Sequence, residues 1–191
     1  MMYYQEKENK WTPPKIRKFD LSASAGSLYS CSIVLDDFST KLAAFEKQGT
    51  RFLFDWESWV GYSEWFWRSF LRNKPGRPFV VRVILSKCAY YNYQFKDDQE
   101  WTCFRLESPD HKHVVYGYAE RNSPLPVELT RLGPEKKASG ATIRVKCRPG
   151  EKQKNQLQIT ELIVGGWVVT GEQLERKPKQ VKGEDKVQGK G

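Results

Sequence analysis

Hydrophobic and polar residues alternate with a period of two in several segments of the second half of the chain. The predicted strand runs are residues 79–95, which begin as a nearly continuous apolar stretch, 100–110, 113–120, 141–148 and 155–171. Such alternation is typical of strands that bury one face. Between the third and fourth runs, residues 123–140 contain the stretch PVELTRL, which suits one or two helical turns. This half is therefore predicted to contain three strands, a short helix and two more strands.

The first half of the chain has a different pattern. Residues 27–35 are apolar and β-branched, which predicts one strand, and residues 36–49 predict a short helix that begins at Asp37 and ends at Gly49. In residues 55–73 large apolar side chains recur every three or four positions, which predicts an amphipathic aromatic helix with Asp55 as its N-cap. Aromatic residues at this spacing usually pack against a neighbouring sheet.

Shifts in composition divide the chain into four parts. Residues 1–19 contain a Pro-Pro pair and mixed charge, and they predict a flexible lead-in. Residues 20–78 form the predicted α/β extension with the aromatic helix, and residues 79–170 form the strand-rich domain. Residues 171–191 are rich in Lys and Gly and poor in large apolar side chains, which predicts a disordered tail.

The strand-rich domain resembles the OB-fold superfamily, a small closed Greek-key barrel. RPFVVRVILSK is similar to its first strand and WTCFRLES to its second, while LGPEKKASGATIRVKCRPG and NQLQITEL are similar to its last two strands with their connecting loop. The resemblance covers roughly half of the chain. It implies a mainly β fold with some α, in which a five-stranded OB-like barrel carries an N-terminal helical and strand extension.

A second architecture stays open. The first strand of the domain lacks a central glycine that would let it bend around a barrel. The alternative is an open, twisted antiparallel sheet with one aromatic-rich helix packed on it, of the α+β class.

Charge and aromatic content suggest an anionic partner. The net charge is +9, and aromatic residues make up 14% of the chain, which is ample for a core. OB-folds that bind oligonucleotides hold them across strands two and three, where aromatic rings stack on bases and basic groups meet phosphates. The resemblance implies such a site here, with stacking residues Tyr90, Tyr91, Tyr93, Trp101, Tyr116 and Tyr118 and phosphate contacts Arg105, Arg144, Lys146, Arg148, Lys152 and Lys154.

The function expected from these residues is non-catalytic binding of single-stranded DNA or RNA with little sequence preference. Acidic residues, among them Asp97, Asp98 and Glu107, lie between the basic ones and weaken an electrostatic groove. The alternative is a protein-interaction or structural module of a larger assembly, including a homo-oligomer, that uses the same aromatic surface.

Other functional classes have little support in the sequence. The cysteines, at 31, 88, 103 and 147, lack metal-ligand spacing, and His111 and His113 are too few for a metal site, so neither a metal nor a cofactor is expected. No catalytic signature is present, and an enzyme is not predicted. Without a secretory segment or a run of about 18 apolar residues, the chain is expected to be cytoplasmic and to have no membrane partner.

Overall fold

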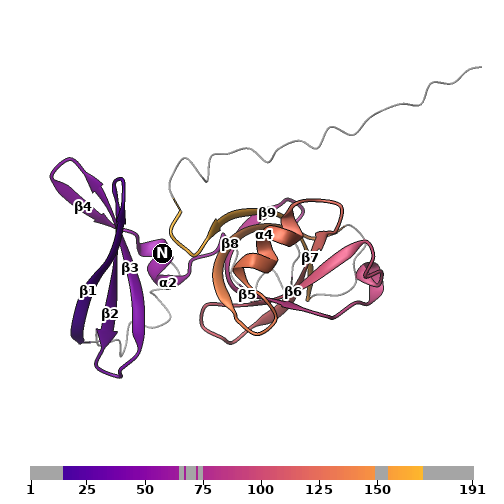
Figure 1. Cartoon of the computed structure of the whole chain (residues 1–191), viewed down its shortest axis with the longest axis horizontal. Coiled ribbons are helices and arrows are strands. Elements are labelled where there is room, and N and C mark those ends of the chain that lie inside the picture. Colours follow the sequence, from indigo (N-terminus) through magenta and orange to yellow (C-terminus); the bar gives the residue numbers. More distant parts are fainter. Residues whose placement is uncertain (1–14, 65–66, 68–71, 73–74, 149–154, 170–191) are drawn as a thin grey trace, which may run out of the picture.

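The computed structural model describes residues 15–64, 67, 72, 75–148 and 155–169. The chain there is mainly β and forms two sheets with few helices (Figure 1). The first sheet contains β1 (Ile16–Ala25), β2 (Leu28–Leu35), β3 (Thr40–Gln48) and β4 (Arg51–Phe54). The second contains β5 (Phe79–Cys88), β6 (Trp101–Glu107), β7 (Val114–Glu120), β8 (Ser139–Lys146) and β9 (Gln156–Gly165). Helices with described bounds are α2 (Trp56–Val60), the 3-10 turn η1 (Tyr93–Phe95) and α4 (Leu125–Leu132).

The second sheet closes on itself. Its strands follow the order β5-β6-β7-β9-β8, and β8 pairs back with β5. All neighbours are antiparallel except β7 and β9, which pair in parallel through three residues each. Helix α4 lies between β7 and β8 in the chain and contributes Leu129 to the core. The predicted order of three strands, a short helix and two strands is confirmed, and the sheet is closed rather than open.

The core inside the closed sheet follows the period-two pattern. On β5, Val81, Val83 and Leu85 point inward and are fully buried, and every other strand adds its inward residues. Gly117 of β7 lies where the packing is tightest, because a Cβ there would come within 2.6 Å of Leu106 Cδ1. The glycine lets the sheet curve closely over this part of its core.

The predicted helix over residues 36–49 is wrong, because this segment is the strand β3 and its turns. Phe38 has a left-handed φ of 64°, and the Asp37 carboxylate accepts a hydrogen bond from the Ser39 amide 2.8 Å away. Asp37 therefore begins a turn between β2 and β3. Gly49, with φ 62°, lies in the turn between β3 and β4. In the described residues, the N-terminal extension begins with an antiparallel sheet, which the short helix α2 follows.

The predicted continuous helix over residues 55–73 is also wrong. Asp55 is the N-cap as expected, since its carboxylate accepts a 3.0 Å hydrogen bond from the Ser58 amide. Helix α2 nevertheless ends after five residues, because Gly61 adopts the left-handed conformation that terminates helices. A Cβ on Gly61 would lie 2.4 Å from the Pro109 side chain, so the backbone approaches that loop closely. Residues 65–66, 68–71 and 73–74 lie outside the described residues.

The ends of the chain are described in part. The predicted flexible lead-in over 1–19 is wrong for its last residues, because β1 already begins at Ile16 and pairs with β2. Residues 1–14 and the predicted tail, from residue 170 onward, lie outside the described residues.

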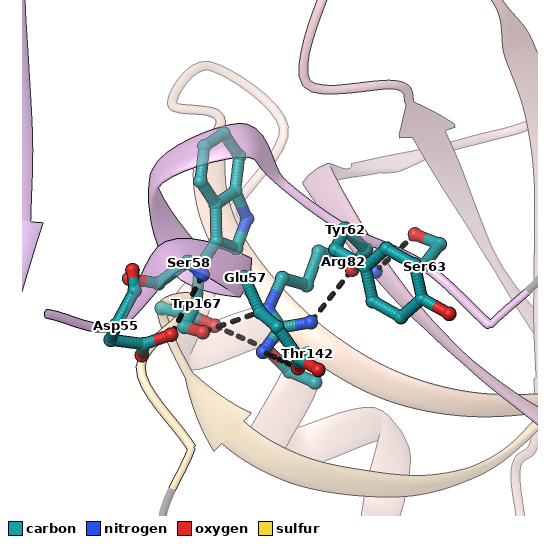
Figure 2. Close-up of polar contacts among 9 residues, drawn as sticks. Asp55, Glu57, Ser58, Tyr62, Ser63, Arg82, Thr142 and Trp167 are labelled. Carbon is teal, nitrogen blue, oxygen red and sulfur yellow. Dashed lines mark hydrogen bonds and ion pairs between the residues drawn. The ribbon is translucent and has the colours of Figure 1, made fainter. Parts of the chain in front are cut away.

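Arg82 of β5 ties the segment after α2 to the closed sheet (Figure 2). Its side chain is 4% exposed and donates to the carbonyl oxygens of Tyr62, at 2.7 Å, and Trp167, at 2.9 Å. It also meets the Glu57 carboxylate at 3.1 Å, while its amide donates to Ser63 Oγ. One buried guanidinium thus joins three segments that are distant in sequence.

Candidate nucleic-acid interface

The outer face of β6 and β7 is the location expected for the site. Along β6, Phe104 and Leu106 point into the core, so the intervening residues point outward. The register sets Cys103 opposite Tyr118 and Arg105 opposite Tyr116 on the same face. The division of β6 into an inner and an outer side matches the prediction.

The loop 89–100 covers part of this outer face. Phe95, in η1, is fully buried, and its ring stacks on Tyr118 with centroids 4.1 Å apart and meets the Trp101 edge at 4.9 Å. Tyr118 Oη donates to the Tyr90 carbonyl at 2.8 Å and accepts from the Gln156 amide at 3.0 Å. These contacts form a second small core between the loop and the sheet.

Trp101 and Tyr118 are therefore not available for stacking on bases, and the prediction for these two residues is wrong. Trp101 is 5% exposed and Tyr118 is fully buried. Burial also raises the pKa of the Tyr118 hydroxyl far above its ordinary value, so the hydroxyl stays protonated and able to donate. Both side chains pack the loop onto the strands.

Three of the predicted tyrosines remain at the surface. Tyr90 is 36% exposed and its ring stacks on half-buried Tyr116, with centroids 4.1 Å apart and an interplanar angle of 26°. Tyr93 is 60% exposed. Tyr91 is half-buried and packs against the loop core. The structure thus brings Tyr90 and Tyr116 together, while Tyr93 is an exposed ring of the same loop as Tyr90.

Arg148 also reaches this face. Its guanidinium carbon lies 5.2 Å from the Trp101 ring centroid and 5.4 Å from that of Phe95, which places a cation over the loop core. One of its nitrogens donates weakly to the Gln94 carbonyl at 3.5 Å. Arg148, which follows β8, therefore lies beside Trp101 of β6 and Phe95 of the loop.

The other predicted cations are less suitable. Arg105 pairs with Glu107, and its hydrogen bond, followed by that of His111, lowers the pKa of the Glu107 carboxyl. Arg144 is largely buried and pairs with Glu161 at 2.9 Å. These arginines are neutralised locally.

Arg144 and Lys146 are also set apart from the expected site by the strand on which they lie. Both lie on β8, which pairs with β5 and β9 and with neither β6 nor β7. The prediction that they share one face with the tyrosines is wrong for Arg144. Lys146 lies closer, since its partner Gln158 on β9 also pairs with Tyr118. Lys152 and Lys154 lie outside the described residues.

A basic recess lies beside α4 and was not predicted. It has a volume of about 320 Å³ and is lined by Lys87, Thr102, Arg121, Pro126, Val127, Thr130 and Arg131. Three cations and two hydroxyl groups converge there without a carboxylate in the lining. Among the described residues, none of the three cations forms an ion pair.

Trp101 connects the recess to the aromatic face. The Arg121 guanidinium donates to the Trp101 carbonyl at 3.4 Å, while the ring of the same tryptophan lies beneath Arg148. The three cations of the recess come from β5, the end of β7 and α4, so no local sequence pattern reveals them. Only the tertiary fold places them together.

The two histidines contact different residues. His111 Nδ1 is 2.6 Å from Glu107, and the His113 ring is parallel to that of Trp67, with centroids 6.4 Å apart. Within the described ranges, no group of three or more potential metal ligands occurs. The helices in those ranges are also too short or too polar to cross a bilayer.

No protein-family model, curated protein or solved structure matches this chain.

Proposed function

We propose that the chain binds single-stranded nucleic acid without catalysis, along the outer face of β6 and β7. The closed sheet supports its assignment as an OB-like barrel in three respects. Its strands follow the order β5-β6-β7-β9-β8, and its parallel pair joins its third strand, β7, to its fifth, β9. Helix α4 lies in the chain between its third and fourth strands, β7 and β8. OB-folds of this kind bind oligonucleotides on the face where the tyrosines are exposed.

The observation that carries the proposal is the pairing of exposed rings with cations that have no carboxylate partner among the described residues. Tyr90 and Tyr116 present a stacked pair and Tyr93 a separate ring. Arg148 lies over the same loop, and the recess at Lys87, Arg121 and Arg131 supplies further positive charge. Rings suit stacking with bases, and unpaired cations suit phosphates. Any contribution of Lys152 and Lys154 stays a prediction.

The aromatic part of the proposal is tested by replacing the two exposed tyrosines of the loop. Because stacking contributes about 1–3 kcal/mol per base, Tyr90→Ala with Tyr93→Ala should weaken binding of a labelled oligonucleotide of about 12 nucleotides by roughly 100-fold. Fluorescence anisotropy measures this change. Phe38→Ala, an exposed aromatic of the first sheet, is the matched control and should leave affinity unchanged. Equal affinities of the tyrosine variant and the control would contradict a stacking role.

The cationic part is tested through salt dependence. On single strands, each phosphate contact contributes about 0.7 to the slope of log affinity against log salt concentration. Arg121→Gln with Arg131→Gln should therefore flatten the slope by about 1.4. The control is Lys47→Gln with Arg51→Gln, which removes the same charge from exposed positions of the first sheet. If both double variants change the slope equally, only net charge matters and the recess is not part of the site.

A second candidate function is self-association through the first sheet. The register sets Phe19 and Leu21 of β1 opposite Ile33 and Cys31 of β2, which are buried, so all four side chains lie on one face. Phe19 is nevertheless 63% exposed and Leu21 67% exposed. Among the described strands, β1 pairs with β2 alone and forms the edge of this sheet.

The partner that this edge fits is a second copy of the chain. An edge strand of ten residues with unpaired backbone groups favours antiparallel pairing with its own symmetry mate. Light scattering should then give twice the 22.3 kDa chain mass, and Phe19→Lys should give a monomer. Leu42→Lys, which lies opposite Ser32 on the other face, should stay dimeric. A single-chain mass for the unaltered protein over a wide concentration range would exclude this candidate.

A further inference from the structure

Two cysteines lie directly opposite each other on the outer face of the closed sheet. Cys88 is the last residue of β5, Cys103 is the third of β6, and the two are register partners. Their sulfur atoms are 3.3 Å apart, and both thiols are free. The loop 89–100, which carries the surface tyrosines, connects the two strands between them.

The backbone around this pair suits a covalent bond between the sulfurs. Directly opposite residues of antiparallel strands have Cα atoms about 4.5–5.5 Å apart, which lies within the range that disulfides span. A sulfur–sulfur bond of about 2.05 Å requires the two atoms to approach by roughly 1.2 Å. Rotation about the side-chain bonds supplies a movement of that size without a shift of either strand.

The two thiols differ in reactivity. Cys88 is half-buried, and the hydrogen bond from the Cys103 thiol, assisted by the nearby Arg105 guanidinium, lowers the pKa of Cys88. Cys103 is fully buried, and its role as donor together with burial raises the pKa of Cys103 far above its ordinary value. Cys31 is buried elsewhere, and burial raises its pKa too. Cys88 is therefore the better nucleophile, with a second thiol in contact with it.

We propose that Cys88 and Cys103 form an oxidation site, at which a hydroperoxide oxidises the two thiols to a cross-strand disulfide. The Cys88 thiolate attacks the peroxide, the O–O bond breaks, and the products are a sulfenic acid on Cys88 and an alcohol, or water when the peroxide is hydrogen peroxide. The Cys103 sulfur then attacks the Cys88 sulfur, and water leaves. Two thiols and one hydroperoxide thus give one disulfide, one alcohol and one water.

The site also has a structural consequence for the loop. A Cys88–Cys103 bond would fasten the two strand ends from which the loop 89–100 departs. Cys103 is adjacent to Tyr118, whose hydroxyl holds the Tyr90 carbonyl, so the cross-link lies directly beneath the loop core. The oxidation site stands whether or not the face binds nucleic acid, because it depends on the two thiols alone.

The test is a titration of the full chain with hydrogen peroxide, followed by alkylation of free thiols and peptide mass mapping. The expected product is a Cys88–Cys103 cross-link with a mass loss of about 2 Da, which dithiothreitol reverses, while Cys31 stays alkylatable. Cys88→Ser should abolish the product and protect Cys103 from oxidation. Overoxidation of Cys88 without a cross-link, or cross-links to Cys147 at equal yield, would overturn the proposal.

A second measurement uses the reduced protein and does not depend on how the oxidised form folds. Phenylarsine oxide bridges two thiols that lie close together, so one equivalent should remove two free thiols from the chain. Cys103→Ser should lose this one-to-two stoichiometry, whereas Cys31→Ser should keep it. Loss of only one thiol per arsenic in the unaltered protein would show that the two sulfurs do not act as a pair.

Discussion

Arg82→Met should lower the free energy of unfolding by about 3 kcal/mol. The substitution removes a buried cation and leaves the oxygen atoms that accept its hydrogen bonds without a donor. The carbonyl oxygens of Tyr62 and Trp167 lose their donors in a place where water has little access (Figure 2). Glu57 contributes less to the loss, because its side chain is 52% exposed and can be rehydrated. Methionine preserves the apolar stem and the length of the side chain.

Urea unfolding followed by circular dichroism measures this loss. Arg77→Met is the matched control, because Arg77 forms a longer, 3.4 Å pair with Glu64 at the surface. A surface pair of this kind contributes at most about 1 kcal/mol. If both variants lose the same free energy of unfolding, the buried contacts of Arg82 do not stabilise the protein more than a surface ion pair does.

Phe95→Ala should also cost about 3 kcal/mol, because it empties the centre of the core between loop and sheet. Phe95 is fully buried, stacks on Tyr118 and meets the edge of Trp101. The cavity left by the ring would be lined by these two aromatics.

Tyr93→Ala provides the control for this variant within the same turn. Tyr93 is separated from Phe95 by one residue and is largely exposed, so its removal should change stability by no more than about 0.5 kcal/mol. The same urea series measures both. If Tyr93→Ala destabilises the protein as much as Phe95→Ala, the buried Phe95 ring is not what fixes the loop to the sheet.

The strands of the second half were predictable because apolar residues recur there at every second position or in short continuous runs. In β5 and β6 the inward residues are apolar, while outward residues such as Arg82 and Trp101 are buried by other parts of the chain. The short helix α4 followed from its position between two such runs. Closure of the sheet was expected only from the resemblance to the OB-fold and not from the local pattern, because it depends on the parallel pairing of β7 with β9, which are distant in the chain.

The first half was harder to predict because its strands lack clean alternation. Strand β3 reads TKLAAFEKQ, whose Lys, Leu, Ala and Glu residues favour helix, and it buries the adjacent Ala43 and Ala44. Tertiary pairing with β2 overrides that preference. In residues 55–73 the helical spacing of aromatics continues past Gly61, but the backbone there turns left-handed and ends α2.

A place for the candidate site could be proposed from the sequence, but the exposure of its residues could not. Aromatic residues of the loop and of β6 and β7 do gather on one face, and Arg148 joins them. Which rings are exposed depends on how the loop 89–100 folds back onto the sheet. The signal for this folding in the sequence was Phe95, an apolar residue among polar ones. The basic recess required three separate elements to come together, and no pattern in the chain indicated it.

The position of β9 has a consequence for how the protein is made. The first sheet pairs only sequence neighbours, so it can assemble hairpin by hairpin as the nascent chain leaves the ribosome. The second sheet cannot close until β9 lies between β7 and β8, and β9 is the last of its strands to be translated. A chain released before Gln156 would leave the inward apolar residues of those two strands in water, and such truncated products should aggregate unless a chaperone holds them.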